Sequence, residues 1–464
     1  MRTTIASVRR RSGAQVAVGA SSVAIATILV GNVDLPVGLA LTAVGVPFVA
    51  WLVVLRAERA GEPLDVRLLV LPIAALLLLA VALAPTGSHD VWSYVMYGRI
   101  VAQHGASAYA TLPSAFPHDP FLHLVARGWR HTPSVYGPVF VMFSAAGSAI
   151  AGSSTVLARL YHQIGAAIAV AIALRLIWGR TKSAAAVMLL GLNPLVIVTV
   201  VNGGHNDALV GLAVLGAVLL ATDEHPAGAG VVLALGALIK VTALLALPMF
   251  VGWLLYRYGR RAAGQLAGAA LATVFFGYAL FGSAAVSALN ANRSLMSRSS
   301  PWQIVRALLH LHADHRFAGI SQATWLAAFG LGSVAVVGAL ALLVAWRRRE
   351  DVDLAAGVAF ALAAYVVAGI YALPWYCMWF LPVAALSRRR PTLVSLAGAG
   401  LFLEAVYAVK DRALPHAIGI GWWWLGAYAG PVLVITAFVV VAFRIPTIRP
   451  GAHESAPALA ASGP

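Results

Sequence analysis

The chain has 464 residues, of which 61% are hydrophobic and only 10% are charged, and its formal net charge at pH 7 is +16. Soluble globular proteins carry about 25% charged residues, so this composition excludes an ordinary soluble domain. Apolar runs near the ~20 residues needed to cross a bilayer recur along the chain, and the alternating segments of a transmembrane barrel do not occur. The sequence therefore predicts an all-α fold, a polytopic transmembrane helical bundle.

The positive charge is concentrated in short arginine blocks between the apolar runs, at 9–11, 257–261, 347–349 and 388–390. Such blocks are typical of cytoplasmic loops. They account for the net charge without a nucleic-acid partner, and we expect none. The single cysteine, Cys377, excludes an internal disulfide.

Fifteen apolar segments are candidate spans. In chain order they are 14–32, 36–55, 67–85, 137–152, 157–178, 184–201, 207–221, 226–239, 241–256, 262–282, 321–345, 353–371, 374–387, 391–409 and 421–443. The arginine blocks place both ends of the chain in the cytoplasm, whereas fifteen crossings would separate the two ends. One short segment, with 137–152 as the candidate, is therefore expected to be re-entrant or interfacial, which leaves about 13 or 14 spans.

This topology gives one integral-membrane domain over residues 1–445, followed by a disordered cytoplasmic tail at 446–464. The N-terminus is expected in the cytoplasm. Residues 86–136 then form a large first extracytoplasmic loop that carries interfacial helices, and 283–320 form a second loop at the same face.

The first loop opens with Ser88, His89 and Asp90, directly after a predicted span. A carboxylate at the boundary between membrane and water suits a general base that meets a lipid-borne substrate. A second interpretation has equal weight, since Asp90 or Ser88 would also cap the helix that follows. Most aromatic residues of the loop are expected to be interfacial anchors. Its histidines show no recognised zinc spacing, so no metal or other cofactor is expected.

Two further polar features interrupt apolar sequence. Residues 202–207 read NGGHND, which suits either a plain turn or a group of donors and acceptors for sugar hydroxyls. Lys240 is isolated among apolar residues, where an ionisable group indicates a functional site. Its ammonium suits a lipid phosphate, and the alternative is a lysine that reaches the interface from a helix end.

The predicted outer face also carries arginines and aromatic residues. Arg293 and Arg298 lie in the second loop, where arginines break the usual charge bias and suit an anionic headgroup. Trp375 and Tyr376 follow a proline at the same predicted face. No nucleotide-binding motif occurs, so a sugar donor is expected to be lipid-linked.

Together these motifs resemble a known family. The carriers of the resemblance are Asp90-Val91-Trp92-Ser93-Tyr94, Trp129-Arg130-His131-Thr132-Pro133, Tyr136-Gly137-Pro138, Gly203-Gly204-His205-Asn206-Asp207 and Lys240. The chain resembles the integral-membrane glycosyltransferases of the GT-C superfamily. Within it, the pattern is similar to the actinobacterial polyprenol-phosphate-mannose-dependent α-1,6-mannosyltransferases, over roughly residues 67–390.

The resemblance implies inverting transfer of mannose from a polyprenyl-phosphate-mannose donor to a glycolipid or glycan acceptor of the cell envelope. The active site would lie on the extracytoplasmic side of the multi-pass cytoplasmic membrane, in contact with membrane lipids. It implies that Asp90 is the general base. The residues implied for the donor phosphate are Lys240, Arg130, Arg293 and Arg298. Those implied for sugar or acceptor are His205, Asn206, Asp207, Tyr136, Trp375 and Tyr376.

Two alternatives stay open at this point. One is another lipid-linked sugar transferase, which transfers arabinofuranose or elongates phosphatidylinositol mannosides. The other is a flippase or transporter of lipid-linked sugars. A transporter would place polar residues near the middle of the membrane in both halves of the chain, whereas here they gather toward one face, and no internal repeat is evident.

Overall fold

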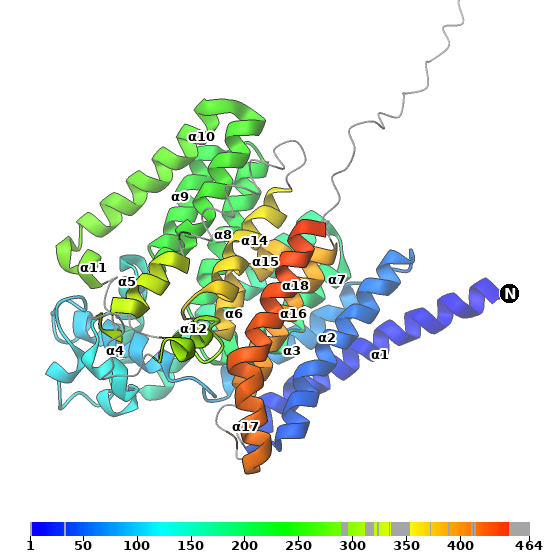
Figure 1. Ribbon diagram of the computed structural model, residues 1–464, viewed down its shortest axis with the longest axis horizontal. Coiled ribbons are helices and arrows are strands. Elements are labelled where there is room, and N and C mark those ends of the chain that lie inside the picture. The colour runs from blue at the N-terminus through cyan, green and yellow to red at the C-terminus, as the bar shows by residue number, and fades with distance from the viewer. Residues whose placement is uncertain are drawn as a thin grey trace, which may run out of the picture.

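The fold is known from a computed structural model, which describes residues 2–31, 34–288, 296–310, 320–322, 324–333, 335, 353–371, 373–387, 390–409, 412 and 414–444. Over these ranges the chain is helical and contains no strand, which confirms the predicted all-α fold (Figure 1).

The labelled elements, in chain order, are α1 (Arg2–Gly31), α2 (Val37–Arg59), α3 (Arg67–Ala82), α4 (Asp90–Ala102), η2 (Pro113–Ala115), η3 (Leu122–Leu124), η4 (Arg127–His131), α5 (Pro138–Ala151), α6 (Thr155–Thr181), α7 (Ala184–Gly191), η5 (Leu195–Asn202), α8 (Asp207–Thr222), α9 (Pro226–Ala237), η6 (Val241–Ala246), α10 (Leu247–Ala279), α11 (Gly282–Ala288), α12 (Trp302–Leu308), α14 (Leu354–Ala368), η7 (Pro374–Trp379), α15 (Leu381–Ala384), α16 (Arg390–Ala408), α17 (His416–Trp424), η8 (Leu425–Ala429) and α18 (Gly430–Arg444).

Five of the described helices are long and apolar enough to cross a membrane, and α7 with η5, bent by 45°, makes a sixth. The five are Ser12–Gly31, Val37–Arg59, Thr155–Thr181, Val241–Ala279 and His416–Ala437. Shorter apolar helices of 10–17 residues lie between them. The polytopic membrane bundle is thus confirmed. The number of 13 or 14 spans stays a prediction, because segment 321–345 falls partly outside the described residues.

Helix α10 contains a sharp bend at Gly259, whose φ is 82°. This left-handed conformation costs glycine little because glycine has no Cβ. The bend falls between the predicted segments 241–256 and 262–282, so the sequence separates these two segments correctly. Figure 1 shows α10 rising to the top of the view and returning toward α11.

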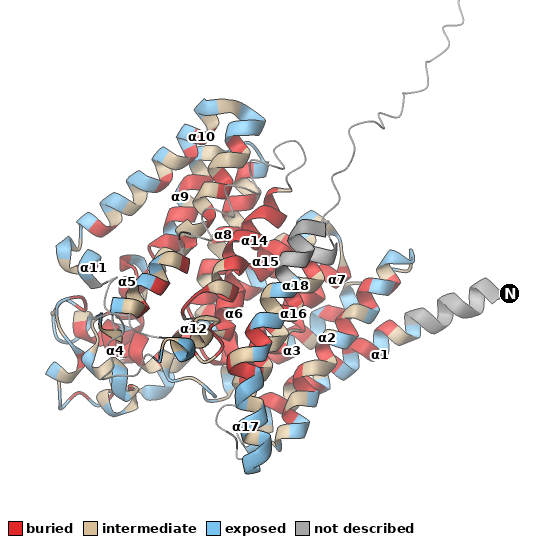
Figure 2. Cartoon of the chain, viewed as in Figure 1, coloured by how far each residue is buried: buried red, intermediate tan, exposed pale blue. Residues whose placement is uncertain are grey.

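The centre of the bundle is packed with apolar side chains. Helix α14 has 13 buried residues among its 15, as expected for a helix that is apolar on every face. Figure 2 shows the same burial along α8 and α6, whereas α17 and the outer faces of α2 are exposed. Large apolar side chains such as Leu71 on α3, which is 77% exposed, point outward and suit contact with lipid.

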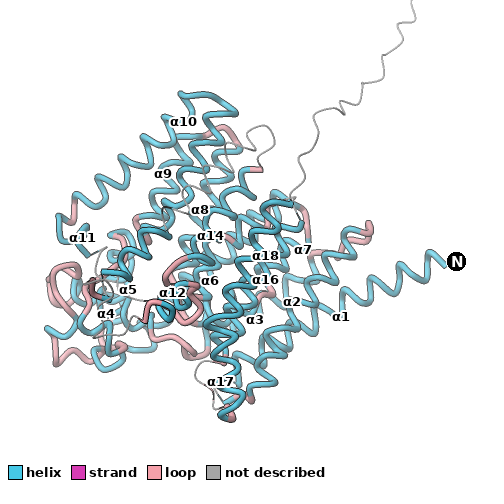
Figure 3. Tube along the Cα trace, in the orientation of Figure 1, coloured by secondary structure: helices cyan, strands magenta, loops and turns pink. Residues whose placement is uncertain are grey.

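Broken elements bring polar residues into this apolar bundle. Pro194 precedes the π-helix η5, which ends at Asn202, and Pro374 begins the 3₁₀ helix η7. π-helical turns are frequent at functional sites. Both η5 and α8 contact η7, so the NGGHND stretch, 202–207, lies against the Pro374–Trp379 segment. Figure 3 shows loops gathered beside α4 and α12 at one side of the bundle.

Candidate active site

Asp90 is the first residue of α4, and its side chain is 19% exposed. Its backbone N–H donates to Oγ of Ser88 at 3.2 Å. The N-cap residue of α4, His89, makes no side-chain capping bond. The carboxylate of Asp90 therefore lies at the exposed start of a helix whose own body is largely buried, where the helix dipole stabilises a negative charge.

The turn that follows η5 brings His205 to Asp90. Nδ1 of His205 lies 3.8 Å from Oδ2 of Asp90, and the hydroxyl of Tyr94 lies 3.3 Å from the same nitrogen. Gly204 makes this approach possible. Its φ is +64°, and a Cβ there would meet the Val91 side chain at 3.3 Å. Burial and the positive charge of Lys240 lower the pKa of His205 well below its ordinary value, so its ring is neutral.

Asn202 joins the segment that carries Asp90 to the turn that carries His205. Its Oδ1 accepts hydrogen bonds from the backbone N–H and the hydroxyl of Thr86, at 2.9 and 3.0 Å. Its Nδ2 donates to the carbonyls of Ala80, Leu83 and Ala84. The carbonyl oxygens at the end of α3 have no partner within the helix, and Asn202 satisfies them together with Arg159 and Gln163 of α6. One fully buried amide thus ties α3 to η5.

Lys240 and Asp207 form an ion pair beneath this turn. Nζ of Lys240 lies 2.9 Å from Oδ1 of Asp207, and Nε1 of Trp379 donates to the same oxygen at 2.6 Å. The ammonium also lies 4.1 Å from the ring centroid of Tyr376, a favourable cation–π geometry. Lys240 thus contacts Asp207 and two aromatic rings, so the structure places it at the predicted sugar-binding turn.

Aromatic rings pack around the turn and the neighbouring Tyr94 of α4. The ring of Trp375 stacks on His205 with centroids 4.2 Å apart, and Tyr376 stacks on Trp379 at 4.3 Å. Tyr136 packs edge-on against Tyr94 at 5.0 Å. These rings hold His205 and the Lys240 ammonium in fixed positions, in addition to any contact with a sugar.

Within the described part of the chain, several buried polar atoms of the turn have no hydrogen-bond partner. They are Nε2 of His205, both side-chain polar atoms of Asn206, and Oδ2 of Asp207. Buried polar atoms are normally paired, so unpaired ones in a native structure need an explanation. A ligand with several hydroxyl groups would supply the missing partners.

A separate hollow, which we call the Arg298 hollow, has an empty volume of about 580 Å³. Its lining residues are Ser297, Arg298, Ser299, Tyr371, Leu373, Pro374, Leu403, Val406 and Tyr407. Nε of Arg298 is buried and has no hydrogen-bond partner among the described residues. Tyr407 links this hollow to the segment before Asp90, because its hydroxyl donates to the carbonyl of Gly87 at 2.8 Å.

The other predicted arginines differ in position. Arg130 donates from Nε to the carbonyl of Val125 at 2.8 Å and from Nη2 to that of His123 at 2.9 Å. In this conformation the guanidinium connects Arg130 to residues 123–125 of the same loop. Arg293 lies outside the described residues. A role for either arginine in binding phosphate stays a prediction.

Across the described residues, no three His, Cys, Asp or Glu side chains come together in a way that would hold a metal ion. Asp119 and His104 of the first loop instead form an internal cluster with Arg99. Nε of Arg99 donates to both oxygens of Asp119 at 2.9 Å, and Nε2 of His104 lies 2.8 Å from Oδ2 of the same carboxylate. A reaction without a metal stays a prediction.

The structure adds residues that sequence reasoning missed. Tyr94 lies in the DVWSY motif, but only the fold shows that its hydroxyl meets His205. Asn202 precedes the GGHND motif without any signal that it holds α3. Trp379 looks like an ordinary apolar residue in the sequence, and its bond to Asp207 spans 172 positions of the chain.

An all-α membrane bundle that brings together a partly exposed aspartate, a buried histidine and unpaired polar groups is consistent with an integral-membrane glycosyltransferase. Residues 5–257, more than half of the chain, match the family described as "Alpha-(1->6)-mannopyranosyltransferase, N-terminal domain". The chain therefore belongs to the alpha-(1->6)-mannopyranosyltransferase family, which confirms the membership that the motifs predicted.

Individual relatives agree with this assignment. The chain is 28% identical over 439 residues to alpha-(1->6)-mannopyranosyltransferase A of Mycobacterium tuberculosis, an alignment that covers 88% of this chain and 81% of the relative. It is 27% identical over 345 residues to alpha-(1->6)-mannopyranosyltransferase B of Corynebacterium glutamicum, covering 66% of this chain and 56% of that protein. The match to the A enzyme of C. glutamicum is 28% over 204 residues, or 43% and 41% of the two chains.

Proposed function

We propose that the chain transfers mannose from a polyprenyl-phosphate donor to a glycan or glycolipid acceptor, with inversion at the anomeric carbon and Asp90 as the general base. The observation that carries this proposal is the juxtaposition of a partly exposed Asp90 with a neutral, buried His205 at 3.8 Å. Family membership supplies mannose as the sugar and an α-1,6 linkage as the product.

The proposed reaction is a single displacement. Asp90 takes the proton of the acceptor hydroxyl as its oxygen attacks the anomeric carbon of mannose. The bond between that carbon and the phosphate oxygen breaks, and polyprenyl phosphate leaves with the electron pair. Attack from the face opposite the phosphate converts a β-linked donor into an α-linked product. The proton then passes from Asp90 to water.

The donor phosphate is assigned to the Arg298 hollow, because a guanidinium suits the two or three oxygens of a phosphate. Its buried Nε, unpaired among the described residues, is available for such a contact. Lys240 already forms an ion pair with Asp207, so we assign it the role of holding the conformation of the turn. Its direct contact with phosphate stays a prediction.

The acceptor and the mannose ring are assigned to the turn. His205, Asn206 and Asp207 each have a buried polar atom without a partner in the described structure, and together these atoms offer both donors and acceptors to sugar hydroxyls. Tyr136 packs against Tyr94, and Trp375 stacks on His205. Both rings therefore lie beside the turn, where an aromatic face can pack against a sugar ring.

The reaction is placed on the extracytoplasmic side of the cytoplasmic membrane. The arginine blocks support this assignment, because they mark their own loops as cytoplasmic and the loops that carry the site lie at the other ends of the spans. A donor linked to a lipid is consistent with this placement, since no nucleotide-binding motif occurs in the sequence. Family membership also favours a transferase of mannose over an arabinofuranosyltransferase or a flippase.

A donor-swap assay tests the proposal. The purified protein in lipid vesicles receives mannosyl, arabinofuranosyl or no sugar on polyprenyl phosphate, or mannose on a nucleotide, together with an α-mannoside acceptor. We expect transfer from the mannosyl lipid alone, with an α-1,6-linked product. Transfer from the nucleotide sugar, or movement of the lipid across the vesicle without any product, would overturn it.

A further inference from the structure

A buried carboxyl group lies on α16, outside the site described above. Glu404 is 4% exposed and belongs to the apolar stretch Leu393–Ala408, within one of the predicted spans. An acidic side chain inside a membrane span is costly and by default indicates a function. Among the described residues Glu404 forms no ion pair. The reason for an acid at this position therefore has to lie in its hydrogen bonding.

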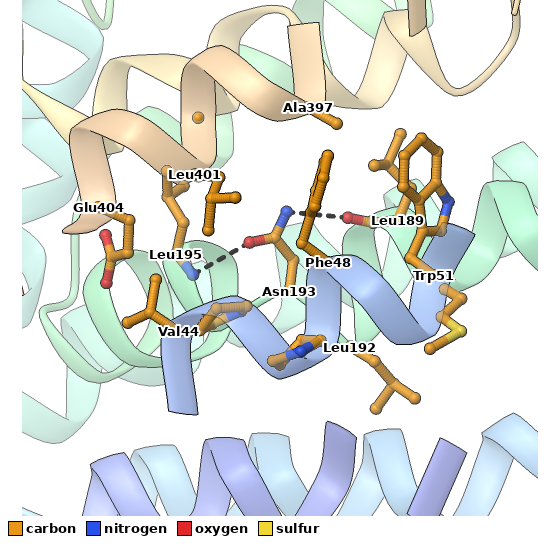
Figure 4. Close-up of a pocket in the computed structure, with 14 residues that line it drawn as sticks. Val44, Phe48, Trp51, Leu189, Leu192, Asn193, Leu195, Ala397, Leu401 and Glu404 are labelled. Atoms are coloured by element: carbon orange, nitrogen blue, oxygen red, sulfur yellow. Dashed lines mark hydrogen bonds between the residues drawn. The ribbon is translucent and has the colours of Figure 1, made fainter. Parts of the chain in front are cut away.

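The hydroxyl of Thr199 on η5 is the donor to Glu404. Oγ1 of Thr199 lies 2.8 and 2.9 Å from the two carboxyl oxygens. Close packing does not hold the carboxyl as well, because two cavities adjoin it, each with room for only about a water-sized group. Figure 4 shows the inner cavity, with α2 on one side and the α16 residues Ala397, Leu401 and Glu404 on the other. The bond from Thr199 thus fixes the position of the side chain.

The turn of α16 that carries Glu404 also borders the Arg298 hollow. Leu403 and Tyr407, on either side of Glu404 in the sequence, line that hollow. The hydroxyl of Tyr407 donates to the carbonyl of Gly87, in the segment that leads to Asp90. One turn of α16 therefore contacts the hollow assigned to the donor phosphate, the segment before the proposed base and, through Glu404, η5.

Thr199 lies equally close to the turn at 202–207. The N–H of His205 donates to the carbonyl of Val200, the residue after Thr199, at 2.9 Å. A Cβ added at Gly203 would collide with the carbonyl oxygen of Thr199 and with the ring of His205. No free space separates η5 from the turn at this point, so a shift of Thr199 moves His205 with it.

We propose that Glu404 is a positioning residue, whose bond to Thr199 holds the Arg298 hollow and the 202–207 turn at a working distance from each other. The inference rests on the proposed function, which assigns the hollow to the donor phosphate and the turn to sugar hydroxyls. A displacement requires the attacking oxygen and the anomeric carbon to be aligned, and a misplacement of about 1 Å can lower the rate about 10²-fold. The bond thus controls the chemical step and leaves the affinity for each substrate unchanged.

Thr199→Val tests the bond, because valine keeps the branched shape of threonine and removes the hydroxyl. We expect the turnover number to fall roughly 10- to 100-fold, while KM for the donor and KM for the acceptor stay close to the wild-type values. Thr199→Ser keeps a hydroxyl and is expected to restore most of the turnover number. The control is Thr42→Val, which keeps the wild-type rate, because the hydroxyl of Thr42 bonds to the carbonyl of Gly38 in its own helix.

Two variants of Glu404 separate the hydrogen bond from the charge. Glu404→Gln retains an oxygen that can accept from Thr199, so its turnover number is expected to stay near that of the wild type. Glu404→Leu removes the acceptor and is expected to lose as much as Thr199→Val. The double variant Thr199→Val with Glu404→Leu should lose no more than either single variant, because both changes remove the same bond.

Thermal unfolding of each variant accompanies the kinetics, and Glu404→Gln keeps the test decisive where an apolar variant fails to fold. A Glu404→Gln protein of normal melting temperature that is as slow as the Asp90→Asn protein overturns the inference, because the charge and not the bond is then required. So does a Thr199→Val protein with the wild-type turnover number, or one in which only KM for the donor rises. Absence of transfer from the mannosyl lipid in the wild type instead contradicts the proposed function.

Discussion

Nζ of Lys240 and Oδ1 of Asp207 lie 2.9 Å apart, and the Asp207 side chain is fully buried. The lysine thus neutralises a carboxylate that neighbours His205 at 3.9 Å. A buried charge that loses its partner is strongly destabilising, whereas a buried pair as a whole adds little net stability. The pair therefore determines the local geometry of the turn more than it raises the stability of the bundle.

We expect Lys240→Met to cost about 3–5 kcal/mol of stability, because it leaves Asp207 charged and unpaired in an apolar site. The double variant Lys240→Met with Asp207→Asn is expected to recover most of this loss. Thermal unfolding in detergent measures both. If the double variant is as unstable as the single one, the ion pair is not the reason for the effect.

Activity of the same two variants separates the roles of Lys240. If Lys240 serves only to hold the conformation of the turn, the double variant regains stability but keeps a raised KM for the acceptor. Its KM for the donor is then near that of the wild type. A donor KM that rises at least tenfold in both variants would instead support a direct contact between Lys240 and the phosphate.

Asp90→Asn is expected to lower the transfer rate by roughly 10²–10⁴-fold, the range that general base catalysis contributes. The amide retains the size of the side chain, so the melting temperature and donor affinity should stay close to the wild-type values. Initial rates with labelled donor measure the loss. The control is Asp223→Asn, which alters an exposed ion pair with Arg180 of little energetic value. Retention of more than about a tenth of the wild-type rate would exclude general base catalysis of this size by Asp90.

Asn202→Asp is expected to reduce the turnover number more than the affinity for donor. The change removes the Nδ2 donor that three carbonyls at the end of α3 share. The carbonyls of Ala80 and Leu83 keep a donor from Gln163, whereas that of Ala84 loses its partner, at a cost of about 1–3 kcal/mol. Oδ1 can still accept from Thr86, but the new carboxylate repels the carbonyl oxygens around it, so we expect the segment that leads to Asp90 to shift. Asn193→Asp serves as the control, since Asn193 bonds only within its own turn among the described contacts. Equal losses of turnover in both variants would argue against a specific role.

The first loop is expected to open in acid. Burial raises the pKa of Asp119, but hydrogen bonds from the N–H of Phe121, from His104 and from Arg99 outweigh burial and lower this pKa below its ordinary value. The stabilisation is then fully present above the ordinary aspartate pKa and is lost as pH falls through the lowered one. Limited proteolysis of the loop from neutral pH down to about pH 3 measures this loss.

Asp119→Asn is the matched test of that acid transition. It leaves the buried Arg99 without its charged partner, so the loop should be cleaved faster at neutral pH and should lose its pH dependence in acid. A loop that opens at the same pH in the variant would assign the transition to another group.

Much of the fold could be predicted because membrane helices are specified by local composition. The segments at 36–55, 157–178 and 207–221 correspond closely to α2, α6 and α8. Segment 374–387 was harder to predict as secondary structure, because Pro374 and Pro382 lie in an apolar run that the structure divides into η7 and α15. Hydropathy reports that such a run is buried, and it does not report where the helix breaks.

The site was only partly predictable for a related reason. Asp90, His205 and Lys240 are visible as polar residues in apolar sequence, and the structure brings them to one place. The Lys240–Asp207 pair, the Tyr94–His205 contact and the links made by Asn202 depend on how distant helices pack. Nothing in the local sequence records those distances, so Lys240 was predicted to bind phosphate and its partner was not foreseen.

The cluster of Arg99, His104 and Asp119 lies at the far end of α4 from Asp90, and Arg99 also donates to the carbonyl of Gly152 after α5. Helix α4 is thus fastened at both ends, by this cluster and by the Thr86–Asn202 link. Segment 103–131 continues from this end of α4, and its buried residue Tyr109 donates to the carbonyl of Tyr136. We expect exchanges at the exposed positions of this segment to change acceptor preference while Asp90 keeps its position, so the segment is a place to engineer that preference.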